Sequence, residues 1–339
     1  TGVCGPFMNQ SLPIEQRFQQ CAEAVQGLLN AVLQLQQVAA LLQTAPVEGR
    51  EWHQLLRQKL APQLGQEAFL AVAVVGGTNT GKSVIFNHLA GSSVSAVSPL
   101  ASGTRHATCL LPAGFLQRHS LQDIFPDFEL RPWQAAEETL QQSEQHLMFC
   151  RESTTLPAEL LLLDTPDIDS DARVNWLRAD AVRRSADVLI AVLTQQKYND
   201  AAFREFFRRA AREGRTAIVI FNQVLLPEDE PWWPAWLQTF CDETGLAPEA
   251  IYLAPADRRA AESLQLPFFE RRHPCCPAGS QRIDPAVPVN PAAHLASLRF
   301  SEIRLKTLQG SLQEVLHVER GAVGWLHELQ QASDGLRVA

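Results

Sequence analysis

The sequence predicts an α/β protein in which a mainly parallel sheet is covered by helices on both faces, with an α-helical bundle built from both chain ends. Short apolar runs alternate with helical patterns through the middle of the chain, as in parallel strands joined by crossover helices. Heptad-spaced apolar residues flank this region on both sides, and each such stripe needs a partner to cover it. At 339 residues the chain can hold a large domain and an accessory element.

Composition and charge exclude several classes of protein. A net charge of −8 argues against general nucleic-acid binding. Seven cysteines without paired C-x-x-C spacing indicate reduced thiols and a cytoplasmic location, and Cys275, Cys276 and His273 are too few for a structural zinc site. No apolar run approaches the ~20 residues that span a bilayer, and there is no signal peptide pattern. No sequence signal marks either end of the chain, which is consistent with a fragment.

The first helical region is predicted at residues 11–66, after a disordered lead-in at 1–10. A second helix is expected from about Val47 to Leu64, with prolines near its ends. The first helix carries a stripe whose steps alternate between four and three, formed by Ile14, Phe18, Cys21, Val25, Leu28, Val32, Leu35, Ala39 and Leu42.

The central domain is predicted at 67–270 and opens with FLAVAVVGGTNTGKSVIFNHL. An uncharged strand, the spacing G-x-x-x-x-G-K-S/T and an amphipathic helix together predict a phosphate-binding loop. Gly76 and Gly81 allow backbone N–H groups to turn toward a phosphate. Lys82 would contact the terminal phosphates and Ser83 would bind Mg²⁺. The predicted nucleotide contacts in this stretch are Gly77, Thr78, Asn79, Thr80, Gly81, Lys82, Ser83 and Val84.

Beyond this loop, strands and helices alternate around an insertion at 116–151 to which we assign no chemistry. The insertion is predicted to contain a helix at Trp133–Phe149. A proline-rich connector without regular structure follows at 271–294, and a second heptad-spaced helical segment at 295–339. Strands are expected at 108–111, 159–163, 187–193, 216–221 and 250–253, and helices at 172–185, 200–212 and 233–244.

Hydrolysis of a nucleotide also needs a metal-facing carboxylate. Asp164 ends an aliphatic strand in Asp-Thr-Pro-Asp, where such a carboxylate belongs, and Asp167 stands in place of the glycine of a D-x-x-G motif. Thr104, in Ser-Gly-Thr-Arg, is expected to give a hydroxyl to Mg²⁺, with Thr108 as the competing candidate.

A base-recognition motif is expected where another apolar strand ends. Asn222 and Gln223 follow this strand as the first residues of N-K-x-D do, but Gln223 replaces the lysine and Leu225 the aspartate. Asp229 is an alternative carboxylate for the base. Asn222 is open to a second interpretation, as a cap of the strand end.

GGTNTGKS, SGTR, DTPD and FNQ on one sheet, with helices before and after it, resemble the dynamin-like large GTPases, particularly their bacterial members. The motifs cover about residues 69–257, and the outer helices match only by layout. The resemblance implies that Lys82, Ser83, Thr104 and Asp164 hold Mg²⁺–GTP. It also implies a helical bundle that moves as the GTP domains dimerise.

Asn79 adds K⁺ as a second expected cofactor, because cation-dependent GTPases carry an Asn at this loop position that helps to bind K⁺. Together with Lys82 at the terminal phosphates and Thr104 at Mg²⁺, Asn79 completes the set of expected catalytic residues. The family's loop glutamine is Thr78 here, and no glutamine follows the Asp-Thr-Pro-Asp motif, so we identify no catalytic base.

The predicted function is Mg²⁺-dependent GTP binding and hydrolysis, coupled to dimerisation or to movement of the helical stalk. The expected partners are GTP, GDP and a second copy of the chain, and the expected location is cytoplasmic or peripheral at a membrane. One alternative is a ribosome-associated or signalling GTPase. Another is a nucleotide-binding scaffold with negligible turnover, suggested by Asp167, Thr78 and the incomplete base motif. An ATP-specific version of either stays open.

Overall fold

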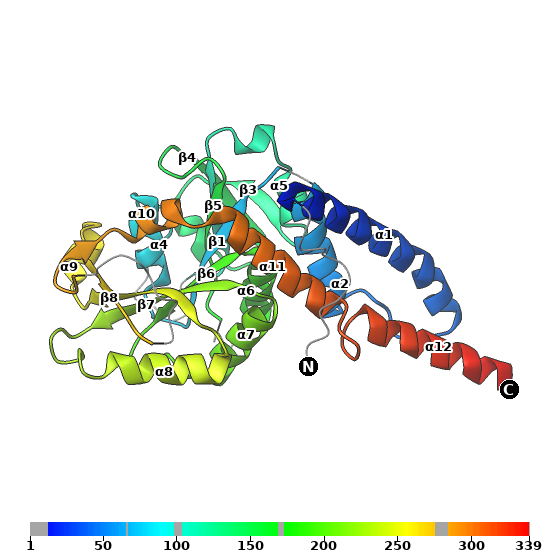
Figure 1. The fold of residues 1–339 in the computed structure, drawn as a ribbon. Coiled ribbons are helices and arrows are strands. Elements are labelled where there is room, and N and C mark those ends of the chain that lie inside the picture. The colour runs from blue at the N-terminus through cyan, green and yellow to red at the C-terminus, as the bar shows by residue number, and fades with distance from the viewer. Residues whose placement is uncertain (1–12, 66, 98–103, 169–172, 275–283, 339) are drawn as a thin grey trace. The chain divides into compact units, whose positions relative to one another are not determined.

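The structure, a computed structural model, describes residues 13–65, 67–97, 104–168, 173–274 and 284–338 (Figure 1). It divides into two compact units. The helical unit comprises residues up to Ala68 and from Leu308 onward, and the sheet unit comprises Phe69–Thr307. The predicted lead-in at 1–10 and the pair Cys275–Cys276 lie outside the described residues.

A ten-stranded sheet forms the centre of the sheet unit, in the order β10-β9-β8-β7-β6-β1-β5-β2-β4-β3. The five strands from β8 to β5 are parallel, β2 is antiparallel to β5, and β9 is antiparallel to β8. The mainly parallel sheet is therefore as predicted. The strands are β1 (Leu70–Gly76), β2 (Ala107–Pro112), β3 (Glu129–Pro132), β4 (Leu147–Ser153), β5 (Leu160–Asp164), β6 (Val188–Leu193), β7 (Thr216–Val224), β8 (Pro248–Pro255), β9 (Phe268–Arg271) and β10 (Pro288–Val289).

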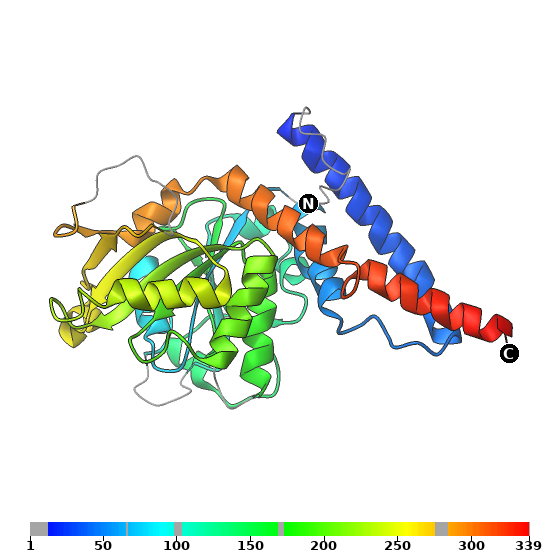
Figure 2. The ribbon, with the colours of Figure 1, turned by 60° about the horizontal axis from the view of Figure 1, so that its bottom comes forward.

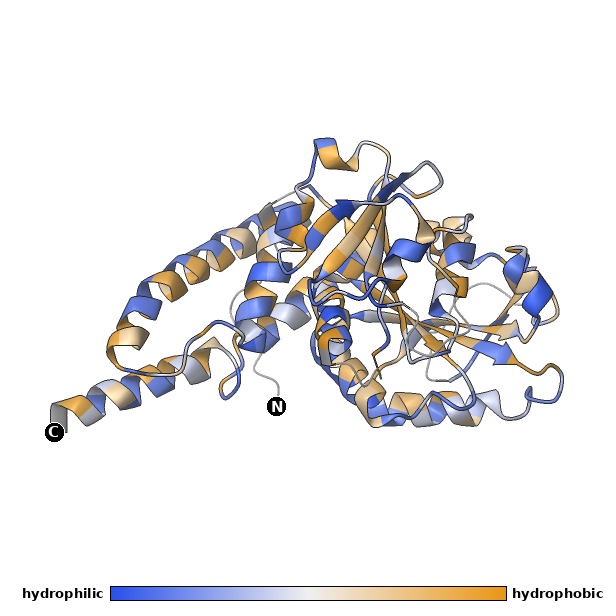
Figure 3. Ribbon diagram, turned by 180° about the vertical axis from the view of Figure 1, so that it is seen from behind, coloured by the Kyte–Doolittle hydropathy of each residue, from blue (hydrophilic) through white to orange (hydrophobic). Residues whose placement is uncertain are grey.

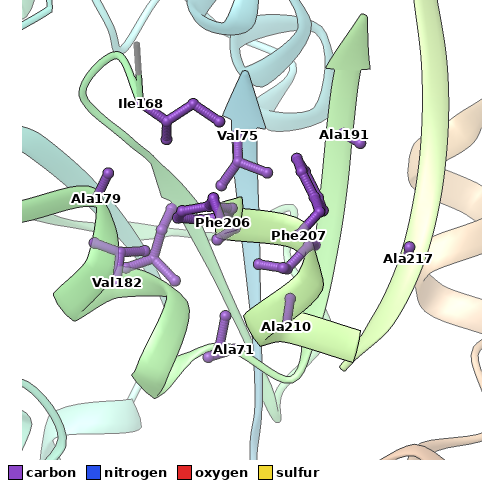
Figure 4. Close-up of a cluster of buried hydrophobic side chains, with 14 of the residues drawn as sticks. Ala71, Val75, Ile168, Ala179, Val182, Ala191, Phe206, Phe207, Ala210 and Ala217 are labelled. Atoms are coloured by element: carbon purple, nitrogen blue, oxygen red, sulfur yellow. The ribbon is translucent and has the colours of Figure 1, made fainter. Parts of the chain in front are cut away.

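Helices cover both faces of this sheet, because its central strands are apolar on both sides. On one face Val182 of α6 and Phe206 and Phe207 of α7 lie in one buried cluster with Val75 of β1 (Figure 4). On the other face Ile85 and other residues of α4 pack against β1. The helices of this unit are α4 (Lys82–Ala90), α5 (Leu121–Ile124), α6 (Arg173–Ser185), α7 (Ala201–Arg212), α8 (Trp233–Thr244), α9 (Arg258–Glu262), α10 (Pro291–Ser297) and the first part of α11 (Phe300–Val315).

The layering is visible in the ribbons. Figure 2 shows the green and yellow-green helices α6, α7 and α8 in front of the strands. Figure 3 shows hydrophobic colour concentrated on the strands, whereas the helices carry both colours. Phe203, Phe206 and Phe207 of α7 are buried in the core of the sheet unit, so this amphipathic helix turns its apolar side to the sheet.

The helix predicted at Trp133–Phe149 is wrong. This part of the insertion forms a short 3-10 turn at Ala136–Leu140 and then β4, which pairs in parallel with β2. Leu147 and Met148 of β4 are buried. Pairing with the free edge of β2 satisfies backbone groups along β4, and this long-range gain outweighs the local helical pattern.

The connector predicted to lack regular structure also differs. Residue 271 ends β9, β10 lies at Pro288–Val289, and α10 begins at Pro291. Asn290 caps α10 by accepting a hydrogen bond from the N–H of Ala292 at 2.9 Å, with Pro291 at the first helical position. Strands as short as β9 and β10 carry too little pattern to be read from sequence.

The helical unit joins segments from both parts of the chain in one core, as the two apolar stripes predict. Trp52 packs against Trp325 with ring centroids 5.7 Å apart, and Arg50 donates to Glu328 at 2.7 and 3.0 Å. The second predicted helix begins at Glu51 and continues through a π-helical turn at 56–60. The helices are α1 (Ile14–Leu41), α2 (Glu51–Leu55), α3 (Ala61–Gly65), the second part of α11, and α12 (Ala322–Val338).

Candidate nucleotide-binding site

The predicted phosphate loop connects β1 to α4 and depends on its two motif glycines. Gly81 caps α4 with a φ of +86°, which a side chain would strain. A Cβ on Gly76 would lie 2.6 Å from the carbonyl oxygen of Val192 and 2.7 Å from Thr80 Oγ1. The motif spacing therefore produces the tight turn that was predicted.

Hydrogen bonds inside the loop hold it ready for an anion. The carbonyl oxygen of Gly77 accepts bonds from Lys82 Nζ and Thr80 Oγ1, both at 2.9 Å. Among the described residues no side chain caps the start of α4, so its first N–H groups and the positive end of its dipole are available to a phosphate. The remaining loop residues predicted to contact nucleotide are Thr78, the exposed Asn79 and, in the first turn of α4, Val84.

Three predicted metal ligands meet beside the loop. Ser83 Oγ donates to Asp164 Oδ2 at 2.8 Å and lies 3.1 Å from Thr104 Oγ1. Asp164 Oδ1 is buried and has no hydrogen-bond partner in the described part of the chain. Two hydroxyls and a carboxylate with a free oxygen are hard donors that fit Mg²⁺. Thr108, the competing candidate, pairs across from Asp164 within β2, and the hydroxyl that meets Ser83 is that of Thr104.

Ser95 is a member of this site that sequence reasoning missed. Its Oγ donates to Asp164 Oδ2 at 2.5 Å. Asn87 of α4 holds Ser95 in place, accepting its N–H at 2.9 Å and donating to its carbonyl at 2.8 Å. Burial raises the pKa of Asp164 to about 6, although the bonds from Ser95 and Ser83 act in the opposite direction. In the sequence Ser95 is one of several serines between Ser92 and Ser98, and no motif spacing distinguishes it from the others.

Asp167 occupies the position of the missing motif glycine and forms a buried ion pair with Lys82 Nζ. Both side chains are almost fully buried. The lysine that would hold the terminal phosphates is therefore shared between this carboxylate and the Gly77 carbonyl. A phosphate at this position would compete with Asp167 for the ammonium group.

The predicted base-contacting residues are tied to the phosphate loop. Asn222 Nδ2 donates to the carbonyl oxygen of Thr80 at 2.9 Å, and Gln223 Nε2 donates to that of Asn79 at 3.1 Å. Asp229 Oδ2 accepts the N–H of Leu225 at 2.8 Å, so one oxygen of the alternative carboxylate closes its own turn. The structure thus brings the base motif to the phosphate loop.

Comparison with known proteins adds the family to this geometry. Residues 71–223, which include the loop, Thr104, Asp164 and Asn222, match the model of the 50S ribosome-binding GTPase family. Residues 71–223 form a P-loop GTPase domain. No curated protein matches the chain.

Among solved structures, the GTPase domain is similar to Era in complex with MgGDPNP and a segment of 16S ribosomal RNA (17% identity, 65% of this chain and 61% of that chain, TM-score 0.36). It is also similar to NFeoB of S. thermophilus bound to GDP·AlF4⁻ (13%, 58% and 62%, TM-score 0.32). A bacterial dynamin pair described in long-range membrane sensing and tethering matches at 13% identity, 85% and 46% coverage and a TM-score of 0.42.

These structural similarities are too distant to support an argument about function. The chain spans about three fifths of the length of the Era and NFeoB chains that it matches. None of the described helices combines the length and apolar character required to cross a membrane. The described residues also hold no group of three or more His, Cys, Asp or Glu that could bind a metal ion.

Proposed function

We propose that the GTPase domain binds Mg²⁺–GTP and hydrolyses its terminal phosphoanhydride bond. The observation that carries this proposal is the convergence of Lys82, Ser83, Thr104 and Asp164 at the start of α4. Mg²⁺ would be held by Ser83 and Thr104, with Asp164 as the carboxylate, and would neutralise charge on the phosphates. Lys82 and the N–H groups of α4 would orient those phosphates for attack by water.

We propose further that the nucleotide state is coupled to dimerisation or to movement of the helical unit, in the manner of a dynamin-like protein. Support comes from the shared core of the two outer segments, in which Trp52 meets Trp325. The boundary between the units falls inside α11, after Thr307, so one helix belongs to both. Association with a membrane surface would be peripheral.

The first experiment is binding and hydrolysis of GTP against ATP, with and without Mg²⁺, over a range of protein concentration. We expect GTP-selective, Mg²⁺-dependent turnover whose specific rate rises with concentration, and no binding by Lys82→Ala. A preference for ATP would overturn the guanine assignment. A specific rate independent of concentration would overturn coupling to dimerisation.

K⁺ is proposed as a second cofactor at Asn79. A monovalent cation there would offset charge that develops on the phosphates, because the exposed Asn79 lies in the loop beside them. Turnover should be faster in K⁺ than in Na⁺, and Asn79→Ala should remove the difference. Equal rates of GTP turnover in K⁺ and Na⁺ would contradict a role for K⁺ at Asn79.

Two other functions are favoured by specific observations. The Lys82–Asp167 ion pair favours a nucleotide-binding scaffold with negligible turnover, because it lowers the availability of the lysine. Tight binding without hydrolysis in the first experiment would select it. The match of residues 71–223 to a ribosome-binding family favours a ribosome-associated GTPase. GTP-dependent cosedimentation with 50S subunits, compared with binding to lipid vesicles, separates that function from the dynamin-like one.

A further inference from the structure

Arg178 of α6 is a buried guanidinium that the proposed mechanism does not use. It is 1% exposed, and Nη1 donates to the carbonyl oxygen of Arg105 at 2.8 Å. Nη2 donates to the carbonyl oxygens of Ser143 at 2.6 Å and Gln145 at 2.7 Å. In the described part of the chain its only other partner is the Asn175 amide oxygen, and Nε has none. Burying a charge among carbonyls is costly compared with an apolar side chain.

The carbonyls that surround Arg178 belong to two segments far apart in sequence. Arg105 directly follows Thr104, whereas Ser143 and Gln145 lie in the insertion. Because one planar fork binds both segments, Arg178 joins the Thr104 segment to the insertion and to α6.

The insertion also holds the Thr104 segment directly. The carbonyl oxygen of Thr139 accepts the N–H groups of Arg105 at 2.9 Å and His106 at 3.1 Å. His106 Nε2 lies 3.1 Å from the carbonyl oxygen of Gln141. The pairing of β4 with β2 anchors the insertion at the next residues along the chain. Backbone and side-chain contacts therefore restrain the residues that follow Thr104.

We propose that Arg178 and the insertion loop at 139–146 form a latch that positions Thr104 at the metal. Thr104 is the residue immediately before the restrained pair, and its Oγ1 lies 3.1 Å from Ser83 Oγ. Arg178 is thus a positioning residue for Mg²⁺, and the insertion preorganises the site. This inference rests on the proposed Mg²⁺–GTP function for its consequence, but the latch itself is testable without nucleotide.

The test replaces Arg178 with lysine, which keeps the charge but cannot span three carbonyls with one planar fork. The matched control is Arg183→Lys, which alters another buried arginine of α6 that pairs with Asp180 and Glu213 instead. His106→Ala removes a different latch contact and serves if the first variant does not fold.

Two measurements are made on each protein. Amide hydrogen exchange at Arg105 and His106, without nucleotide, reports the latch. The Mg²⁺ concentration that half-saturates GTP binding, compared with GTP affinity in EDTA, reports the positioning of Thr104.

In Arg178→Lys we expect exchange at both amides to become faster. The half-saturating Mg²⁺ concentration should rise about tenfold, the lower end of typical losses from supporting residues of metal sites. GTP affinity in EDTA should stay the same, and His106→Ala should change both measurements less. In a Thr104→Ala background the Mg²⁺ effect of Arg178→Lys should vanish.

Unchanged exchange in Arg178→Lys, or the same increase in Arg183→Lys, would overturn the latch. Faster exchange with an unchanged Mg²⁺ requirement would overturn the positioning role. Absence of GTP binding in the unaltered protein would instead refute the proposed function, and the exchange result would still decide whether the latch exists.

Discussion

At the residue scale, the lysine of the phosphate loop is already paired with a carboxylate. Asp167 and Lys82 form an ion pair in which both side chains are nearly excluded from solvent. Charge-assisted bonds of this kind are stronger than neutral ones, and exclusion of water strengthens them further. A bound triphosphate would therefore compete with Asp167 for Lys82.

Replacing Asp167 with glycine should raise affinity for a non-hydrolysable GTP analogue about tenfold, because the released lysine no longer exchanges one anion for another. Affinity for GDP, which lacks the terminal phosphate, should rise less. Fluorescent nucleotide titrations measure both constants, with Asp242→Asn, at an exposed carboxylate of α8 that accepts a hydrogen bond from Gln238, as the control. Weaker analogue binding by Asp167→Gly would show that Asp167 assists the site instead.

Ser95 should matter for the metal because it restrains the carboxylate of Asp164. Removing its hydroxyl in Ser95→Ala should raise the Mg²⁺ concentration needed for GTP binding about tenfold, as is typical for residues that support metal ligands. The control is Ser93→Ala, which alters an exposed serine of the same stretch. An equal Mg²⁺ requirement in both variants would mean that Ser83 alone suffices to orient Asp164.

At the element scale, the entry into α4 depends on one left-handed residue. A Cβ on Gly81 would clash with Asn222 Nδ2 in addition to straining the φ of +86°. We expect Gly81→Ala to abolish detectable nucleotide binding, since the loop and the base motif would both shift. Gly91→Ala, at the other end of α4, has φ +69° with open space around the Cβ. The Gly91→Ala variant should lose about 1 kcal/mol of stability in urea unfolding. It should still bind nucleotide in isothermal titration, whereas Gly81→Ala should not.

The start of β2 carries a pH dependence through His106. Burial lowers its pKa from 6.5 to about 4, and Arg178 acts in the same direction. The unfolded chain takes up this proton near pH 6.5 and the folded chain only near pH 4, so the stability is complete above pH 6.5 and is lost as the pH falls toward 4.

The free energy of unfolding should fall less between pH 6.5 and pH 4 in His106→Asn than in the unaltered protein, by up to about 3 kcal/mol. Urea unfolding at several pH values between 4 and 6.5 measures this change, with His327→Asn, at an exposed histidine of the helical unit, for comparison. Identical pH profiles for the unaltered protein and His106→Asn would contradict a neutral, buried imidazole.

On the scale of the whole molecule, two units with separate cores should respond separately to mutation. Trp325 is 1% exposed in the core of the helical unit, and Trp325→Ala should destabilise that unit by about 3 kcal/mol. Calorimetry should then show the helical unit unfolding at a lower temperature than the sheet unit, while the nucleotide affinity of the sheet unit is retained. Leu326→Ala, at a 43% exposed neighbour, is the control. If Trp325→Ala instead shifts one calorimetric transition of the whole protein to lower temperature, the two units unfold together.

Much of this molecule could be predicted because its signals are local. The apolar run of β1, the glycine spacing and the amphipathic α4 lie next to one another in sequence, and Asp164 directly ends an aliphatic strand. Local propensity and periodicity determine such features before any long-range contact forms. The same is true of the two heptad stripes that the helical unit brings into one core.

The sequence by itself thus determined the phosphate loop, the parallel sheet and the pairing of the outer helices. Only the tertiary structure decided what lies around them: β4 beside β2 in place of a helix, Ser95 on Asp164, Asp167 on Lys82, and Arg178 on the Thr104 segment. Each of these contacts joins residues that are tens of positions apart. Their energies come from satisfying buried polar groups and strand edges, and which groups are left to satisfy is known only once the chain has folded.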